Sequence, residues 1–170
     1  GSPYTISAVL SPSDVLDNYA ITYNTGVFTI TPKGVTVTAD PQSKEYGTAT
    51  DPALTYTSSD PTVTFSGGLV RVAGETAGTY AINQGTLSNS NYTITFNPGT
   101  FTITKKAASV TPADKSKVYG ADDPELTGSL VGFIPADSVT ATYSRVAGET
   151  VLGSPYTISA VLSPSDVLDN

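Results

Sequence analysis

The sequence predicts an all-β protein made of tandem immunoglobulin-like β-sandwich units. Three observations lead to this prediction. Apolar and β-branched polar residues alternate with a period of two, turn-forming residues recur about every 8 to 12 residues, and the chain repeats itself. No stretch shows a convincing helical period. Each repeat offers about six or seven short strands, which is enough for a small two-sheet sandwich.

Four segments show the clearest alternation, with apolar residues on one face and threonine on the other. Half-buried strands have this pattern, and the branched Cβ of threonine suits their solvent face. The four predicted strands are residues 35–38, 62–65, 92–96 and 101–104. Asp-Pro, Tyr-Gly, Gly-Gly and Asn-Pro-Gly clusters separate these and further short segments, and they predict turns.

The chain contains a repeat at two levels. Its first 18 residues recur letter for letter at its end, so it consists of one period of 170 − 18 = 152 residues plus 18 more. Two divergent copies of a smaller unit lie inside this period. The matching pairs are SKEYG at 43–47 with SKVYG at 116–120, RVAGET at 71–76 and 145–150, and NYTITFNPGTFTIT from Asn91 with NYAITYNTGVFTIT from Asn18.

This alignment divides the chain into three parts. Residues 33–104 form a complete β-sandwich repeat, residues 105–170 the N-terminal part of a second repeat without its last strand, and residues 1–32 the tail strands of such a repeat. A fragment without a terminal strand exposes an unpaired edge and apolar positions. We therefore expect strand-complemented chain ends, in which a segment like 19–31 completes the C-terminal fragment of its own chain or of another.

Complementation between chains predicts domain swapping and head-to-tail self-association. The two copies of the 18-residue segment, at 1–18 and 153–170, are then expected to compete for one strand position.

Composition excludes several classes of function. The chain has no cysteine and no histidine, which excludes disulfides, zinc–thiolate sites, cysteine nucleophiles and a Ser-His-Asp triad. Paired carboxylates in matched contexts are also missing, so we expect no enzyme activity and no catalytic residue. Eight basic against 15 acidic residues give a net charge of −7, which disfavours nucleic acid and anionic membranes. No apolar run approaches the roughly 20 residues of a membrane helix.

Several motifs in fixed order carry a resemblance to a known family. TVTAD, SK-YG, DP-LT, RVAGE, GTYAI and a closing NYTITF with GTFTIT together resemble the YGX-type MBG domain, a tandem repeat of large bacterial surface and secreted adhesin-like proteins. The resemblance covers residues 33–104, and the second copy once its two pieces are joined. It implies an extracellular location and neighbouring repeats of the same chain as partners, and it brings no catalytic or ligand-binding residues.

One carboxylate cluster is a candidate metal site. Asp122, Asp123 and Glu125, with Asp114 nearby, supply oxygen atoms of the kind that calcium prefers. The spacing is not that of an EF-hand, and the first copy keeps only Asp51 of the cluster. A solvated acidic turn is the preferred interpretation, and no other cofactor is expected.

Two Arg-Glu pairs, Arg71 with Glu75 and Arg145 with Glu149, lie four residues apart around a glycine. They fit either a ligand-binding clamp or an ion pair at a hairpin rim, which contributes at most about 1 kcal/mol. We favour the ion pair.

Lysine and threonine side chains suggest two further kinds of site. Lys44 and Lys117 raise the possibility of an intramolecular isopeptide bond, which needs a buried lysine beside an Asn or Asp and a catalytic carboxylate. A lysine in a polar turn motif fits that requirement poorly. The Thr-x-Thr pairs resemble ice- or glycan-binding arrays, but they are scattered over different strands.

Tyrosines such as Tyr46 and Tyr56 are candidates for stacking sugars. Tyr80 and Tyr92 lie within predicted strands, where we expect their rings to fill the core with the hydroxyls at its rim.

Taken together, these patterns favour a structural spacer or stalk repeat of an extracellular bacterial surface protein involved in cell adhesion. Such a repeat holds a distal module away from the cell. The alternative is a module that binds a glycan or a host protein.

Overall fold

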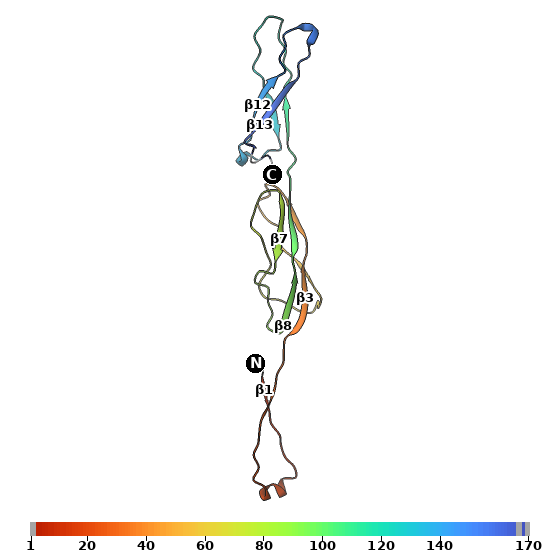
Figure 1. Cartoon of the computed structure of the whole chain (residues 1–170), viewed down its shortest axis with the longest axis vertical. Helices are drawn as coiled ribbons and strands as arrows, with labels where there is room; N and C mark the ends of the chain where they lie inside the picture. The colour runs from red at the N-terminus through yellow and green to blue at the C-terminus, as the bar shows by residue number, and fades with distance from the viewer. Residues whose placement is uncertain (1–2, 166–167, 169–170) are drawn as a thin grey trace.

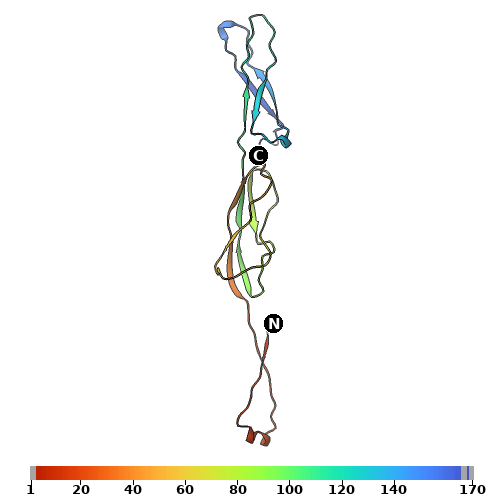
Figure 2. The same ribbon diagram turned by 180° about the vertical axis from the view of Figure 1, so that it is seen from behind.

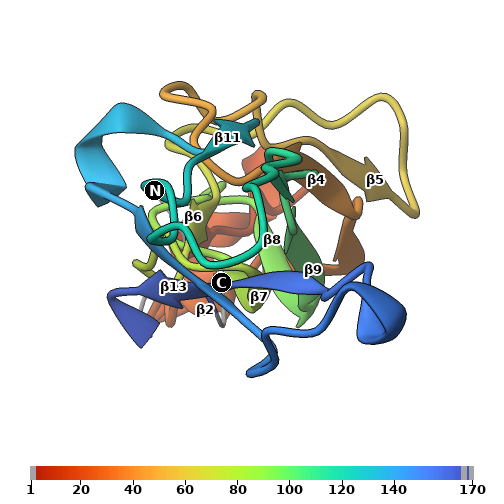
Figure 3. The same ribbon diagram turned by 90° about the horizontal axis from the view of Figure 1, so that it is seen from above.

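The computed structural model describes residues 3–165 and residue 168. Three parts follow one another along the long axis: an N-terminal segment (3–32), a central unit (33–104) and a C-terminal unit (105–165 with 168) (Figure 1). The view from behind shows the same order, and the view along the axis superimposes the parts within one outline (Figures 2 and 3). Residues 166–167 and 169–170, at the end of the repeated 18-residue segment, lie outside the described residues.

The N-terminal segment is a long open hairpin. Strand β1 (Tyr4–Ile6) pairs antiparallel with β2 (Gly26–Phe28), and the 3₁₀ helix η1 (Ser13–Asn18) lies at the far end (Figure 1). None of its described residues is buried. A two-stranded hairpin with no layer packed on it has no core, so its apolar side chains face water.

The central unit contains two sheets. The first has the order β5-β3-β8, with β5 at Tyr56–Ser58, β3 at Lys33–Ala39 and β8 at Tyr92–Asn97. The second has the order β4-β9-β7-β6, with β4 at Gln42–Glu45, β9 at Gly99–Thr104, β7 at Gly78–Asn83 and β6 at Val70–Arg71. The ladders β3–β8 and β4–β9 are parallel. Each of the last two strands of the unit thus lies beside one of the first two: β8 pairs with β3 in the first sheet, and β9 pairs with β4 in the second.

The core of the described chain lies between these two sheets. Ala39 of the first sheet packs with Ile82, Phe101 and Ile103 of the second, and Tyr46, Leu54, Leu69, Tyr80 and Phe96 surround them. Every buried residue that the structure describes belongs to this unit. The alternation in β3 and β9 places their apolar residues on the inner face, as the period of two predicts.

The C-terminal unit repeats only part of this architecture. Strands β10 (Ser109–Pro112) and β11 (Gly128–Val131) form one antiparallel pair, and β12 (Thr140–Arg145) and β13 (Ile158–Ser163) form another. The 3₁₀ helices η2 (Pro135–Asp137) and η3 (Val151–Gly153) lie in the loops. The pair β10–β11 corresponds to β3–β5, and β12–β13 corresponds to β6–β7.

The two copies of the 18-residue segment do not share a position in this chain. The first supplies β1, which pairs with β2, and the second supplies β13, which pairs with β12. Each copy therefore has a partner strand within its own part of the chain.

The all-β prediction is confirmed, but one predicted strand is wrong. Residues 62–65 form a turn followed by irregular backbone. The carboxylate of Asp60 accepts hydrogen bonds from the backbone N–H and the hydroxyl of Thr62, and the amide of Asn89 donates to the carbonyl of Thr64. Side chains thus form hydrogen bonds with backbone groups that would pair with a neighbouring strand if this segment were a strand. Phe65 packs edge-on against Tyr56.

The described part of the chain holds no helix with the length and hydropathy needed to cross a membrane.

Candidate functional site

Four charged side chains meet across the inner face of the four-stranded sheet in the central unit. Lys44 of β4 contacts the carboxylates of Asp51, at 2.7 Å, and of Glu75. Arg71 of β6 pairs with the same two carboxylates from the opposite edge of the sheet. Lys44 lies opposite the buried Ile103 in the β4–β9 ladder, and Arg71 lies opposite the buried Ile82 in the β6–β7 ladder. Both side chains therefore lie on the core side of the sheet. Their side chains are only 3% and 11% exposed.

Arg71 is fixed by more than its ion pairs. Its guanidinium lies 4.8 Å from the ring centroid of Phe101 and 5.6 Å from that of Tyr80, so it stacks on the two central strands. Its Nη1 also donates to the carbonyls of Val72 and Gly74, at 3.0 and 2.7 Å. The arginine therefore ties the β6 edge, the loop after it and the middle of the sheet into one arrangement.

The C-terminal unit repeats this cluster residue for residue. Lys117 lies 2.6 Å from both Asp123 and Glu149, and Arg145 pairs with the same two carboxylates. The guanidinium of Arg145 stacks on Tyr156 at 5.6 Å, as Arg71 does on Tyr80. The second cluster has no counterpart to Phe101 among the ring contacts of the described residues.

These contacts hold the groups in their charged forms. Hydrogen bonds from Arg71 and Lys44 lower the pKa of Asp51 to about 2, and those from Arg145 and Lys117 lower the pKa of Asp123 to about 2. In return, hydrogen bonds to Asp51 and Glu75 raise the pKa of Lys44. Each cluster is thus a closed set of two cations and two anions.

We expect the free energy of unfolding to fall as the pH drops from about 4 toward 2. The pKa of a free aspartic acid is about 3.9, whereas Asp51 and Asp123 have values of about 2 in the fold. Their stabilising contribution is complete above the unfolded pKa and is lost as the pH falls through the folded one. Urea unfolding followed by circular dichroism at several pH values measures this slope. Asp51→Asn should flatten it, and Asp14→Asn, on η1, should not; equal slopes in both variants would contradict the assignment.

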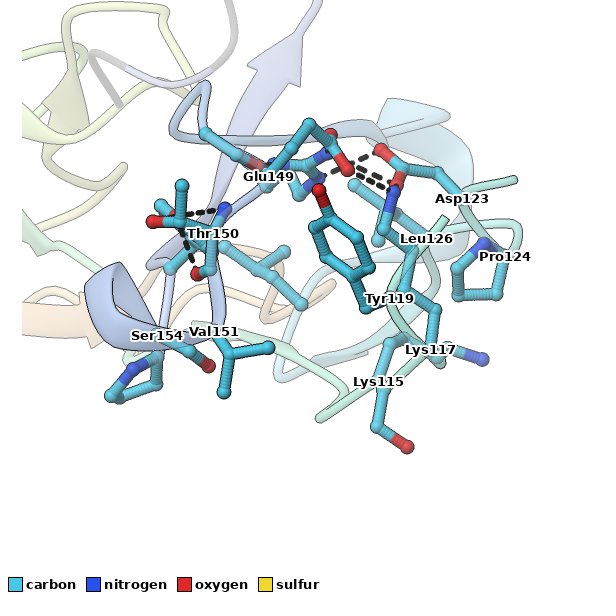
Figure 4. Close-up of a pocket in the computed structure, with 16 residues that line it drawn as sticks. Lys115, Lys117, Tyr119, Asp123, Pro124, Leu126, Glu149, Thr150, Val151 and Ser154 are labelled. Carbon is cyan, nitrogen blue, oxygen red and sulfur yellow. Dashed lines mark hydrogen bonds and ion pairs between the residues drawn. The ribbon is translucent and has the colours of Figure 1, made fainter. Parts of the chain in front are cut away.

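An open groove lies beside the second cluster, with a volume of about 280 Å³ (Figure 4). On one side it is lined by residues 115–117 and Tyr119, and on the other by Tyr156, just before β13, and by Ile158, the first residue of β13. The groove is also lined by Lys117, Arg145 and Glu149 of the cluster. Tyr119 forms part of its wall and is 73% exposed.

A short connection joins the central and C-terminal units. Only residues 105–108 separate β9 from β10, and the ammonium of Lys106 lies 2.6 Å from the carboxylate of Glu45. The hydroxyl of Tyr46, in the turn after β4, donates to Asp137 of η2 at 3.0 Å, which raises the pKa of the tyrosine. The neighbouring Gly47 faces Ile134 of the next unit. The Tyr-Gly turn of one unit is thus a contact with the following unit.

Both clusters are built from the same recurring motifs: Lys from SK-YG, Asp from DP-LT, and Arg with Glu from RVAGE. The family model of the MBG domain (YGX type) matches residues 35–102 and again residues 108–166. The chain belongs to the MBG domain family. No curated protein and no solved structure matches the chain significantly. MBG domains occur in surface proteins and form a structural repeat family.

The predicted Arg-Glu pairs of both MBG units are present, but they are not isolated pairs at a rim. Lys44 and Asp51 join the first pair, and their equivalents join the second. Sequence reasoning missed this, since the lysine and the aspartate lie 27 and 20 residues before Arg71. The signal that could have found the cluster is that all four residue types recur together in the second copy.

The geometry around Lys44 includes the parts that an isopeptide bond would need: a buried lysine, an aspartate and a second carboxylate. The charges oppose the reaction, which requires a neutral amine and a protonated carboxyl. Here the pKa of Lys44 is raised and that of Asp51 is held at about 2 by Arg71. We therefore expect the intact mass of the purified chain to equal that of the unmodified sequence. Loss of one water per MBG unit would contradict this expectation.

The calcium candidates Asp122, Asp123 and Glu125 do not act as one group. Both carboxylate oxygens of Asp123 contact cations, from Lys117 and Arg145. Among the described residues there is no group of three or more acidic side chains placed to hold a metal ion. Tyr80, whose ring we expected in the core, is half-buried beside it, and its hydroxyl donates to the carbonyl of Thr76 at the rim.

Proposed function

We propose that this chain is a spacer segment of a large extracellular bacterial adhesin-like protein, in which stacked MBG units project a distal module from the cell surface. The observation that carries the proposal is the joint between the units. Four residues of connection, the Lys106–Glu45 ion pair and the Tyr46–Asp137 hydrogen bond hold successive units end to end. With such a joint between units, the length of the protein increases with the number of its repeats.

The same joint gives the proposal a direct test. The chain has no cysteine, so Thr100→Cys and Thr142→Cys, both on exposed strand positions, provide unique sites for two spin labels. We expect a narrow distance distribution between them by pulsed electron paramagnetic resonance. Tyr46→Phe should broaden it, because the variant loses the hydroxyl that bonds Asp137. Tyr56→Phe, whose ring packs on Phe65, is the matched control. A broad distribution in the unchanged chain would remove the basis for a stiff spacer.

Small-angle scattering adds a second readout. An elongated particle is expected, and its profile should be the same with calcium and with a chelator, because the proposal assigns no structural role to a metal. A profile that changes with calcium would instead support the acidic turn at Asp122 and Asp123 as a site.

A module that binds a glycan or a host protein is the second candidate function. The observation in its favour is the groove of the C-terminal unit, which Tyr119 and Tyr156 line. Screening the chain against a glycan array tests it, with Tyr119→Ala as the control. Binding that this variant abolishes would favour the second candidate over the spacer.

A further inference from the structure

Two segments of the central unit lie side by side along the length of the unit. The entry segment (residues 33–45) contains β3 and β4, and the exit segment (residues 92–104) contains β8 and β9. The two segments pair in parallel, from Lys33 opposite Tyr92 to Glu45 opposite Thr104. Partners are 92 − 33 = 104 − 45 = 59 residues apart at both ends, so the register does not slip between the two ladders.

Both segments change from the first sheet to the second at the same level. Asp40 and Pro41 separate β3 from β4, and Pro98 separates β8 from β9. Proline has no N–H to donate to a ladder, so pairing stops there and resumes in the second sheet. Gly99 allows the close approach at this level, because an added Cβ would lie 2.8 Å from the carbonyl oxygen of Ala39. The two ladders together form one seam between the entry and exit segments.

Hydrogen bonds close the seam at both ends. At its beginning, the backbone N–H of Lys33 donates to the carbonyl of Asn91 at 3.0 Å. At its end, the backbone N–H of Tyr46 donates to the carbonyl of Thr104 at 2.9 Å, and the hydroxyl of Thr104 donates to the carbonyl of Lys44 at 3.3 Å. The backbone pairing therefore extends over the full length of both segments.

The charge cluster of the central unit adds a side-chain link across the seam. Lys44 belongs to the entry segment and contacts Asp51 and Glu75. The same two carboxylates contact Arg71, whose guanidinium lies on the ring of Phe101 in the exit segment. The cluster thus connects the shorter of the two ladders, β4–β9, through side chains as well as through the backbone.

The course of the chain decides how tension reaches the seam. The chain enters the unit at residue 33, at one end of the long axis, and leaves it at residue 104, at the other end (Figure 1). Tension along the chain pulls the entry segment toward the first end and the exit segment toward the second. Because the segments are parallel and paired throughout, this tension loads the hydrogen bonds of both ladders together, in shear.

We propose that the seam is a mechanical clamp, through which the central MBG unit bears tension along the chain. While the seam holds, force passes directly from the entry segment to the exit segment. Residues 46–91, which contain β5, β6 and β7, then bear no load. The proposal rests on the spacer function, since a repeat that projects a distal module from a cell is under tension when that module is held.

Forced unfolding of single molecules in two pulling geometries tests the proposal. Thr31, Thr50 and Ala107 are exposed and the chain has no cysteine, so Cys variants at these positions give unique attachment points. Attachment through Thr31→Cys and Ala107→Cys shears the seam. Attachment through Thr50→Cys and Ala107→Cys pulls on the same end of both segments and opens the seam one pair at a time. In both geometries the chain should lengthen by roughly 200 Å, at about 3.6 Å per residue.

We expect a severalfold higher rupture force in the shear geometry at the same pulling speed. The urea midpoints of the two double variants should be equal, because forced unfolding follows the unfolding rate along the direction of pulling and not the equilibrium stability. Equal rupture forces in the two geometries would overturn the proposal.

A pair of matched variants tests the side-chain link in the shear geometry. Glu75→Gln removes a charge that contacts both Lys44 and Arg71, so it should lower the rupture force. Glu149→Gln is the same change at the equivalent position of the next unit, outside the attachment points, and should leave the force unchanged. An equal loss in both variants would count against the clamp.

Failure of the clamp and failure of the spacer give different results. Equal forces in the two geometries, with a narrow distance distribution between the spin labels, would remove the clamp and leave the spacer in place. A broad distribution with a higher force in shear would remove the stiff spacer and leave the clamp as a property of the single unit.

Discussion

Phe101→Ala is expected to lower the free energy of unfolding of the central unit by about 3–5 kcal/mol, the range for truncating a buried phenylalanine. Phe101 is completely buried, packs with Ile82 and Ile103, and carries the guanidinium of Arg71 on its ring. Truncation leaves a cavity and removes one of the surfaces that hold the arginine in place. Urea unfolding followed by circular dichroism measures the loss.

The repeat supplies a matched control for this variant. Phe28→Ala changes the same residue in the equivalent strand motif, but at a site where the ring is 55% exposed and no core surrounds it. At concentrations where the chain is a monomer, we expect it to change the free energy of unfolding by less than about 0.5 kcal/mol. Similar losses in both variants would show that the central unit is not the core of the chain.

Gly74→Ala is expected to destabilise the central unit by about 2–4 kcal/mol, because backbone strain and overpacking act together. Gly74 has a φ of +153°, a conformation that residues with a side chain rarely adopt. An added Cβ would lie 2.1 Å from the ring of Tyr80. The ring or the loop must move, and the carbonyl that Arg71 contacts moves with the loop. Thermal and urea unfolding both report the loss.

Gly68→Ala is the control for this variant. Nothing lies within 4 Å of the position that its Cβ would take, so the methyl group projects into open space. We expect a change within about 0.5 kcal/mol. A Gly74→Ala variant as stable as Gly68→Ala would mean that the Arg71 loop is free to rearrange.

Alternation along the sequence was a sound guide where a strand had a neighbour to pair with. It predicted residues 35–38, 92–96 and 101–104, which lie in β3, β8 and β9. It was wrong at 62–65, where Asp60 and Asn89 supply local hydrogen bonds to the backbone instead. Period-two patterns describe the faces of a strand and say nothing about its partner, so the parallel ladders of β8 and β9 could not be predicted from them.

The charge clusters were likewise predictable from the sequence only in part. The four-residue spacing of Arg71 and Glu75 predicted their pairing, because both lie on one tight loop. The stacking of Arg71 on Phe101 and its contact with Asp51 depend on strands brought together across the sheet. The tertiary structure thus turns an isolated pair into a four-residue network, in which the two cations are nearly buried and the two carboxylates stay partly exposed.

By itself, the sequence determined that the chain is all-β, that it repeats, and which segments are equivalent, since all three follow from local periodicity and self-similarity. Only the tertiary structure decided that β9 is one of the two central strands of its sheet, because strand order depends on contacts between residues far apart in the chain.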